Sequence, residues 1–232
     1  METLPGGYTL SLSAGAFPLS TDSMVLADFV RLPRDARVLD FGSGCATLGV
    51  LLCAGDPGCH VTGIELSKSA HDSALSNIDR NHLRSRLASI CGDLRTVAPE
   101  LEAGSFHCCV SNPPYFSAGP LSKDHPTARR DDLCSTEELF CAAARVLRYG
   151  GDFFLVHRPE KLAELCACGT RHGLEAKRLR LVRHKKGGPV ALILLQLRKG
   201  GKPGLVWEEE ALHHEDGTIT DYYKRVYHLQ EA

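Results

Sequence analysis

The chain has 232 residues, of which 43% are hydrophobic and 24% are charged, an ordinary composition for a globular protein. This length predicts one α/β domain over residues 1–232, with an N-terminal extension (1–33), a core (34–200) and a C-terminal tail (201–232). The net charge of −1 excludes a polycationic chain, so a nucleic-acid partner would have to bind a local basic patch. No apolar run reaches the roughly 18 residues of a membrane span, and the N-terminus does not predict a secretion signal.

The ten cysteines do not predict disulfides or a metal site. No C-x-x-C pair occurs among them, so the ligand spacing of a structural zinc site is absent. The run from His213 to Asp216 offers potential ligand atoms but precedes Gly217 in an expected turn, which favours a solvated loop. We interpret the cysteines as small hydrophobic side chains, and we expect no metal and a reducing, cytoplasmic location.

Strands and helices alternate along the first half of the chain, which predicts a parallel sheet. In chain order, the expected elements are a helix near Asp22–Val30, a strand at Arg37–Asp40, a helix from the following loop to about Ala54, a strand at His60–Leu66, a helix at Ser67–Arg80, and strands at Leu87–Cys91 and Phe106–Ser111. Because parallel strands end at one edge of a sheet, the residues that follow them are expected to face a common cleft.

The second half of the chain predicts one more parallel strand and then an antiparallel hairpin. A long segment without clear periodicity, 116–134, precedes a capping box at Ser135–Glu138. The expected elements are a helix from there to about Arg148, a strand at Asp152–His157, a helix from Pro159 to about His172, strands at Arg178–Arg183 and Val190–Leu197, and a last helix near Asp221–Tyr227. The joint between the last two strands is too short for a parallel crossover. The sequence therefore predicts an α/β fold with a mostly parallel, seven-stranded sheet.

A glycine-rich loop, Gly42-Ser43-Gly44-Cys45-Ala46-Thr47, follows the first core strand and opens a helix. Glycines at such a position let a ligand approach the backbone. A dinucleotide site of the form G-x-G-x-x-G/A would require a small residue at position 47, which is threonine. The G-x-G-x-G/A spacing of S-adenosylmethionine (SAM) enzymes requires one at position 46, which is alanine. The spacing therefore favours SAM over NAD.

Acidic residues end the next two strands. Glu65 follows the second strand and can accept hydrogen bonds from ribose hydroxyls, in a SAM site or in an NAD site. Asp93 follows the third strand and can accept a hydrogen bond from an adenine amino group, while the Leu94 N–H meets a ring nitrogen. The alternative interpretation of Asp93 is a turn aspartate.

The tetrapeptide Asn112-Pro113-Pro114-Tyr115 follows the fourth strand. Two prolines cannot continue a sheet ladder, so they make a stiff exit that holds the Asn112 side chain and the Pro113 carbonyl in place. These two oxygen acceptors and the following aromatic ring suit a flat group that carries an NH2. The motif is typical of methyltransferases that modify an exocyclic or amide nitrogen.

Several segments, in this order, resemble a known family. The resemblance rests on Phe17–Ser23, the glycine loop, Gly63–Glu65, Ser111–Phe116, Val156–Glu160 and Arg198–Gly204, and it spans about residues 8–227. Together they are similar to the bacterial tRNA1(Val) (adenine-37-N6)-methyltransferase family. This resemblance implies a Rossmann-like class I methyltransferase fold, SAM as cofactor and tRNA as partner.

The resemblance also implies roles for individual residues. Asn112 with Pro113 would hold the target amine, and Tyr115 would stack on the base. The implied cofactor-binding residues are Asp40, Gly42, Gly44, Glu65, Asp93, Leu94 and Asn112. The chain departs from the family pattern in two places: Ala46 replaces the last glycine of the loop, and Arg129-Arg130-Asp131 stands where an arginine followed shortly by an acid is expected.

Basic residues suit an RNA substrate, although a solvated edge hairpin is the alternative explanation for most of them. The expected RNA contacts are Lys123, Arg129, Arg130, Lys185, Lys186, Lys199 and Lys202. Further basic residues in or beside the predicted hairpin also suit RNA: Lys177, Arg178, Arg180 and Arg183. Two other functions stay open. One is a protein glutamine N5-methyltransferase, which uses the same tetrapeptide but would be expected to have a separate N-terminal helical domain. The other is a non-catalytic SAM-binding module associated with RNA, which would not need Asn112 and Tyr115.

Overall fold

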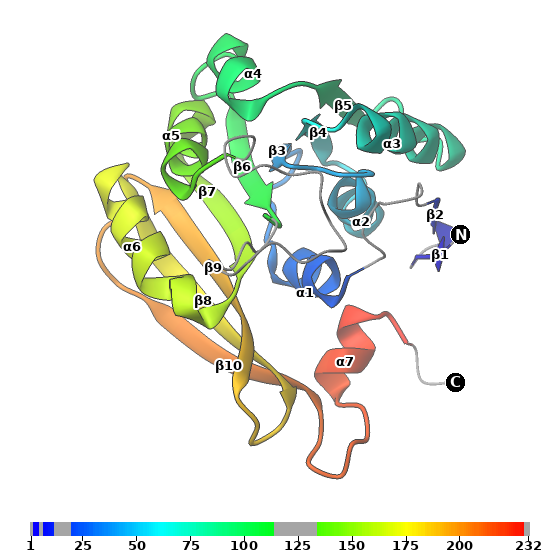
Figure 1. Ribbon diagram of the computed structural model, residues 1–232, viewed down its shortest axis with the longest axis vertical. Helices are drawn as coiled ribbons and strands as arrows, with labels where there is room; N and C mark the ends of the chain where they lie inside the picture. The colour runs from blue at the N-terminus through cyan, green and yellow to red at the C-terminus, as the bar shows by residue number, and fades with distance from the viewer. Residues whose placement is uncertain (1, 5–6, 12–19, 114–133, 230–232) are drawn as a thin grey trace, which may run out of the picture.

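An eight-stranded mixed sheet forms the centre of the computed structural model, which describes residues 2–4, 7–11, 20–113 and 134–229 (Figure 1). Its strands are β3 (Arg37–Phe41), β4 (His60–Glu65), β5 (Leu87–Cys91), β6 (Phe106–Ser111), β7 (Leu147–His157), β8 (Leu174–Lys185), β9 (Val190–Lys199) and β10 (Val206–His213). Their order is β10-β8-β9-β7-β6-β3-β4-β5, and β9 runs antiparallel to both of its neighbours. A small separate sheet pairs β1 (Glu2–Thr3) with β2 (Thr9–Leu10).

Helices cover both faces of the sheet. They are α1 (Thr21–Phe29), α2 (Thr47–Gly55), α3 (Lys68–Arg80), α4 (Leu94–Glu100), α5 (Thr136–Val146), α6 (Leu162–Arg171) and α7 (Asp221–Val226), with a 3-10 turn η3 (Pro159–Lys161) before α6. Helices α1, α2, α3 and α7 pack on the face that carries Val38 and Phe154, and α4, α5 and α6 pack on the face that carries Leu39 and Phe153. Neighbouring residues of one strand serve opposite cores because successive side chains alternate across the sheet.

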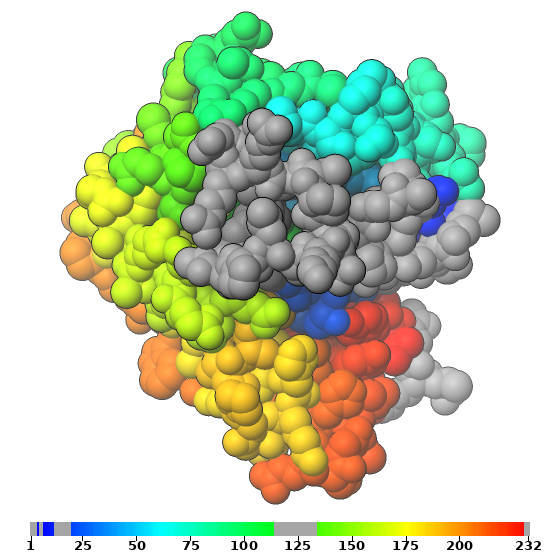
Figure 2. Space-filling model, viewed as in Figure 1, coloured from blue at the N-terminus to red at the C-terminus, as the bar shows by residue number. Residues whose placement is uncertain are grey.

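The sheet has two functionally distinct edges. We call the edge where the parallel strands β3 to β7 end the carboxyl edge, and the opposite one, where these strands begin, the amino edge. Since β8 is also parallel to β7, the β8–β9 turn projects from the carboxyl edge, whereas β9 ends at the amino edge. Figure 2 shows the β8–β9 turn and the turn after β10 together at one end of the molecule, and α3 and α4 at the other.

The structure confirms the predicted class I fold and adds elements to it, among them α4 and β10. Helix α4 follows Asp93 directly, and β10 extends the sheet from within the segment that the sequence assigned to a tail. Strand β10 contains Glu208-Glu209-Glu210 and therefore lacks an apolar pattern. Its acidic side chains pair across the strand boundary, Glu208 with Arg180 and Glu209 with Arg183, so charge complementarity stabilises a strand that hydrophobic periodicity does not reveal.

Arg180, one of the basic residues that the sequence suggested for RNA binding, is buried inside the protein. Its side chain is 6% exposed and donates to Asp28 on α1 at 2.6 Å and to Glu208 at 2.9 Å. Asp28 also accepts a hydrogen bond of 2.9 Å from Arg225 on α7. This network joins α1, α7 and the outer strands, so Arg180 has a structural role that does not require contact with RNA.

All ten cysteines are free thiols, and six of them are buried. The buried ones behave as the small hydrophobic side chains that the sequence predicted, whereas Cys91, Cys134 and Cys141 are exposed. None of the described helices is long and apolar enough to cross a membrane.

Candidate active site at the carboxyl edge

The glycine loop and Asn112 leave the sheet side by side. Phe41, the last residue of β3, pairs with Ser111, the last residue of β6, and the Ser111 hydroxyl donates to the Phe41 carbonyl at 3.0 Å. Gly42 continues the first strand and Asn112 continues the second. Because neighbouring strands lie about 5 Å apart, this register brings the predicted cofactor loop next to the predicted catalytic tetrapeptide.

The glycine loop is pinned to the end of β4 and leaves open space beside it. The N–H groups of Gly42 and Ser43 both donate to the Ile64 carbonyl, at 3.0 and 3.1 Å. Gly42 and Gly44 have φ values of +70° and +55°, which favour glycine. A Cβ atom added to either glycine would meet no atom within 4 Å among the described residues beyond its chain neighbours, so backbone conformation and not packing requires these glycines.

Ala46 also adopts the left-handed conformation, with φ of +66°. This is the position where the family pattern has glycine, and it directly precedes α2 as its N-cap residue. An alanine there costs free energy that a glycine would not, because its methyl group approaches the backbone. The departure seen in the sequence is therefore a point of backbone strain in the predicted cofactor loop.

Glu65 closes the loop from the other side. One carboxylate oxygen accepts from the Gly44 N–H at 2.8 Å and the other accepts from the Ser67 N–H at 2.7 Å. Ser67 in turn is the N-cap of α3. Each carboxylate oxygen has a second lone pair, so the predicted ribose contacts are compatible with this arrangement. Glu65 therefore fixes the conformation of the glycine loop through its hydrogen bond to Gly44.

Asp40 is buried beside this loop with an unsatisfied oxygen. The residue is 2% exposed, and among the described residues its Oδ2 atom has no hydrogen-bond partner. Burial, together with the negative charge of Glu65, raises the pKa of Asp40 to about 7. The Ser43 hydroxyl is likewise buried without a partner in the described part of the chain. Unsatisfied polar atoms at this loop indicate a place prepared for a polar ligand.

Asp93 is the N-cap of α4. Its side chain accepts from the Arg95 N–H at 2.8 Å, and hydrogen bonds from the Arg95 side chain hold the pKa of Asp93 below its usual value. Leu94 is 9% exposed and packs in the core. The geometry fixes Asp93 as a capping residue at the carboxyl edge, and its contact with adenine stays a prediction.

Asn112 is held by a residue to which the sequence assigned no role. Its side-chain Nδ2 donates to the hydroxyl of Ser23 on α1 at 3.0 Å, and Ser23 is 8% exposed. Ser20, the N-cap of α1, accepts from the Ser23 N–H through its side chain. Figure 1 shows the end of β6 directed toward α1. With Nδ2 bound to Ser23, the orientation of the Asn112 amide is set, and Oδ1 is its acceptor atom.

The remaining predicted site residues divide into three groups. Pro114, Tyr115, Lys123, Arg129 and Arg130 lie outside the described residues. The exposed Lys185 and Lys186 lie at the carboxyl-edge end of the β8–β9 hairpin, the same edge as Asn112. At the amino edge are Lys199, whose Nζ atom donates to the Leu147 carbonyl, and Lys202. The structure therefore does not bring the predicted RNA contacts into one patch.

One group of potential metal ligands lies elsewhere, between α5 and α6. Glu137, Cys168 and His172 place one ligand atom each within 4.8 Å of one another. Hydrogen bonds to the Glu137 carboxylate from Arg171, Cys168 and His172 lower its pKa to about 2. Since Arg171 already neutralises this carboxylate at 2.6 Å, we interpret the group as a network that joins two helices.

Comparison with known proteins agrees with this geometry. Residues 15–165 match the methyltransferase small domain family. A tRNA1(Val) (adenine(37)-N6)-methyltransferase from Shewanella halifaxensis is 31% identical over 68% of this chain, and the match spans 64% of that protein, slightly less than two thirds. The protein of the same name from Tolumonas auensis is 31% identical over 84% of this chain and 81% of its own length. A crystal structure of a predicted O-methyltransferase from Agrobacterium tumefaciens shares the fold, with a TM-score of 0.74, 22% identity and coverage of 90% of this chain and 96% of that one.

The strain at Ala46 is directly testable. Ala46→Gly should raise the free energy of unfolding by about 0.5–1 kcal/mol, because relief of the left-handed alanine outweighs the extra entropy of an unfolded glycine. Ala142→Gly, in the interior of α5, is the matched control and should lower it by about 1 kcal/mol. Urea denaturation without SAM measures both. A loss of stability in Ala46→Gly would mean that packing of the buried methyl group outweighs the strain.

Proposed function

The chain belongs to the methyltransferase small domain family of SAM-dependent enzymes, and from this premise we propose that it methylates N6 of an adenine in tRNA. The names of its relatives support adenine 37 of tRNA1(Val) as the position. The observation that carries the proposal is the hydrogen bond from Asn112 to Ser23, which fixes an amide acceptor beside the glycine loop.

The residues of the carboxyl edge fit SAM. Among the described residues, space beside Gly42 and Gly44 would admit a ligand close to the backbone, and the Glu65 carboxylate next to Gly44 would accept hydrogen bonds from ribose hydroxyls. SAM has a net positive charge from its sulfonium and ammonium groups, so the Asp40 carboxyl, whose Oδ2 atom has no hydrogen-bond partner among the described residues, suits it. Asp93 and the Leu94 N–H would meet the adenine ring. When bound, SAM supplies an electrophilic methyl group.

Asn112 and Pro113 would prepare the target nitrogen. An adenine N6 lone pair is delocalised into the ring and is a weak nucleophile. Hydrogen bonds from the NH2 group to the Asn112 Oδ1 atom and the Pro113 carbonyl stabilise the positive charge that develops on nitrogen as the new bond forms. They also direct the lone pair toward the methyl carbon, and a proton leaves the nitrogen for solvent after transfer. In this proposal Tyr115 stacks on the base.

The lysines of the β8–β9 turn support an RNA substrate. Lys185 and Lys186 are exposed on the edge that carries Asn112, where a tRNA bound through an anticodon-loop base would present its phosphates. An anticodon-loop base is already unpaired, so turning it into the site costs little. The free thiols support a reducing cytoplasm as the place of action, and we treat residues 1–232 as one catalytic domain.

The proposed substrate can be tested by incubating the protein with methyl-labelled SAM and either total tRNA or a cell protein extract. We expect N6-methyladenosine in the tRNA after nucleoside analysis. Methyl label found only on protein glutamine would assign the site to the alternative amide substrate. Tight SAM binding without transfer to either would favour the non-catalytic module.

The Asn112–Ser23 hydrogen bond predicts a graded loss of turnover. Asn112→Ala should lower kcat by about 10²-fold, because the acceptor for the developing charge is lost. Ser23→Ala should lower kcat by about tenfold through misorientation of the amide, with little change in KM or SAM affinity, and Ser23→Thr should restore most of it. Ser73→Ala, on the exposed side of α3, is the control. An unchanged kcat in Ser23→Ala would remove Ser23 from the site.

The raised pKa of Asp40 predicts proton release on SAM binding. At pH 7 about half of the free Asp40 groups hold a proton, and a cationic ligand lowers their pKa and expels it. Calorimetry in buffers of different ionisation enthalpy should therefore show about half a proton more released by the wild type than by Asp40→Asn. The difference should vanish near pH 9, where Asp40 is already ionised. Equal proton release by both proteins at pH 7 would exclude Asp40 from the cofactor site.

A further inference from the structure

A second concave site lies at the amino edge of the sheet. It is a pocket of about 440 Å³ lined by Arg31, Leu32, Pro33, His107, Arg148, Gly150, Asp152, Arg178, Gln196 and Arg198. His107 is the second residue of β6, whereas Asn112 follows its last residue. The two sites therefore lie at opposite ends of one strand, about 16 Å apart along it. The proposed catalysis uses none of the pocket residues.

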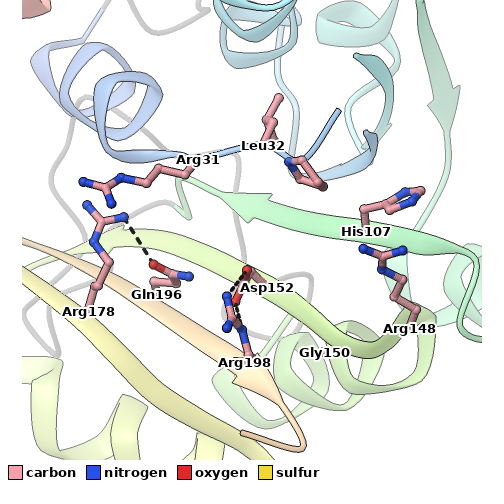
Figure 3. A pocket seen from close by; sticks show the side chains of 10 residues that line it. Arg31, Leu32, His107, Arg148, Gly150, Asp152, Arg178, Gln196 and Arg198 are labelled. Carbon is pink, nitrogen blue, oxygen red and sulfur yellow. Dashed lines mark hydrogen bonds and ion pairs between the residues drawn. The ribbon is translucent and has the colours of Figure 1, made fainter. Parts of the chain in front are cut away.

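The pocket is strongly basic in a chain of almost zero net charge. Its lining includes the guanidinium groups of Arg31, Arg148, Arg178 and Arg198 and a single carboxylate, that of Asp152. Figure 3 shows Arg31 and Arg178 together at one end, Arg148 beside His107 at the other, and the Arg198–Asp152 pair between them. Several elements that are distant in sequence thus contribute cations to one hollow.

Two of these arginines form hydrogen bonds with other described side chains of the protein, and two do not. Arg198 makes two hydrogen bonds of 2.9 Å to Asp152, and Arg178 donates to Gln196 at 3.2 Å. Within the part of the chain that the structure describes, the side chains of Arg31 and Arg148 have no hydrogen-bond or ion-pair partner. Burial and the repulsion from Arg31 lower the pKa of Arg178, so a bound anion would relieve a repulsion that the free pocket contains.

A β-bulge carries Arg148 and the aromatic residue Tyr149 at consecutive positions. Phe106 pairs with Leu147 and Cys108 pairs with Asp152, so residues 148–151 loop out between these two pairs. Tyr149 in this bulge is 80% exposed, and its hydroxyl donates to the Gly200 carbonyl at 3.1 Å. Tyr149 is not among the residues that line the pocket, but it follows Arg148 directly in the chain and offers an exposed ring outside the hollow. Proteins bind unpaired nucleotides by combining such a ring, on which a base stacks, with a positive charge for the phosphate.

We propose that this pocket binds phosphodiester groups of the RNA substrate, with Arg31 and Arg148 on the phosphate oxygens and Tyr149 stacked on an adjacent base. The planar guanidinium fork matches a phosphate in two-point contacts. This inference rests on the proposed function for the identity of the RNA, but it concerns residues remote from the transfer step. A free phosphate compound would use the same arginines and would not need the ring of Tyr149.

The test measures binding of total tRNA at several salt concentrations and, separately, binding of tripolyphosphate by calorimetry. Arg31→Gln and Arg148→Gln should each weaken tRNA binding about fivefold and reduce the slope of log affinity against log salt by about 0.7–0.9. Tyr149→Ala should weaken tRNA binding without changing the slope. SAM affinity should be unchanged in all three variants, which also verifies that they fold.

Two further variants distinguish specific binding in the pocket from a general effect of positive charge on the protein surface. Arg34→Gln removes a charge from the segment that carries Arg31, but its side chain is 95% exposed and does not line the pocket, so tRNA affinity should stay within about twofold of wild type. Arg148→Lys keeps the charge and should keep the salt slope while losing part of the affinity. Equal weakening by Arg34→Gln would overturn the pocket as a specific site.

The two phosphate sources and the two proposals give different results. If Arg31→Gln abolishes tripolyphosphate binding but leaves tRNA binding intact, the RNA assignment is wrong and the pocket serves a free phosphate compound. Unchanged binding of both probes would overturn the site altogether. Neither result affects the methylation assay with Asn112→Ala, so failure of the pocket is distinguishable from failure of the proposed function. Conversely, tRNA that binds through Arg31 without being methylated would support the pocket and contradict the proposed reaction.

Discussion

Phe41 and Ser111 pair at the ends of the neighbouring strands β3 and β6, and this register sets the glycine loop against Asn112. The glycine loop begins directly after Phe41, and Asn112 follows Ser111 directly, so the proposed cofactor and substrate residues start about 5 Å apart. A shift by one residue would turn the side chains of a whole strand to the opposite face and would separate the two motifs. The hydrogen bond from the Ser111 hydroxyl to the Phe41 carbonyl reinforces the pairing.

The free protein holds unfavourable arrangements at the positions that a ligand would occupy. Asp40 is buried without a partner for Oδ2 among the described residues, Ala46 is left-handed, and Arg31 repels Arg178. Such features cost folding stability and persist where function requires them. The charges around the two sites differ in sign: the acids Asp40, Glu65 and Asp93 surround the glycine loop, which suits a cationic cofactor, and arginines line the pocket at the amino edge, which suits phosphate. A net charge of −1 conceals this separation.

Local patterns predicted most of the fold and the conformation of the glycine loop, because strands, caps and glycine-rich turns depend on neighbouring residues. The capping box at Ser135–Glu138 and the turn after β3 are such cases. Hydrophobic periodicity does not predict strand β10, because its three consecutive glutamates have no apolar pattern. Ion pairs with arginines on β8 stabilise the strand instead. The contact between Ser23 and Asn112 joins residues 89 positions apart, and the basic pocket collects residues from five parts of the chain. Only the folded topology brings these groups together, so no local pattern could reveal them.

The most direct measurement of the central claim is a crystal structure of the protein with S-adenosylhomocysteine and adenosine. The account predicts that N6 of adenosine lies within about 3 Å of the Asn112 Oδ1 atom and the Pro113 carbonyl, while Nδ2 keeps its bond to Ser23. It also predicts that the ribose of the cofactor product contacts Glu65. An adenosine bound elsewhere, or an Asn112 amide that faces it through Nδ2, would contradict the proposed arrangement of acceptor, methyl donor and target nitrogen.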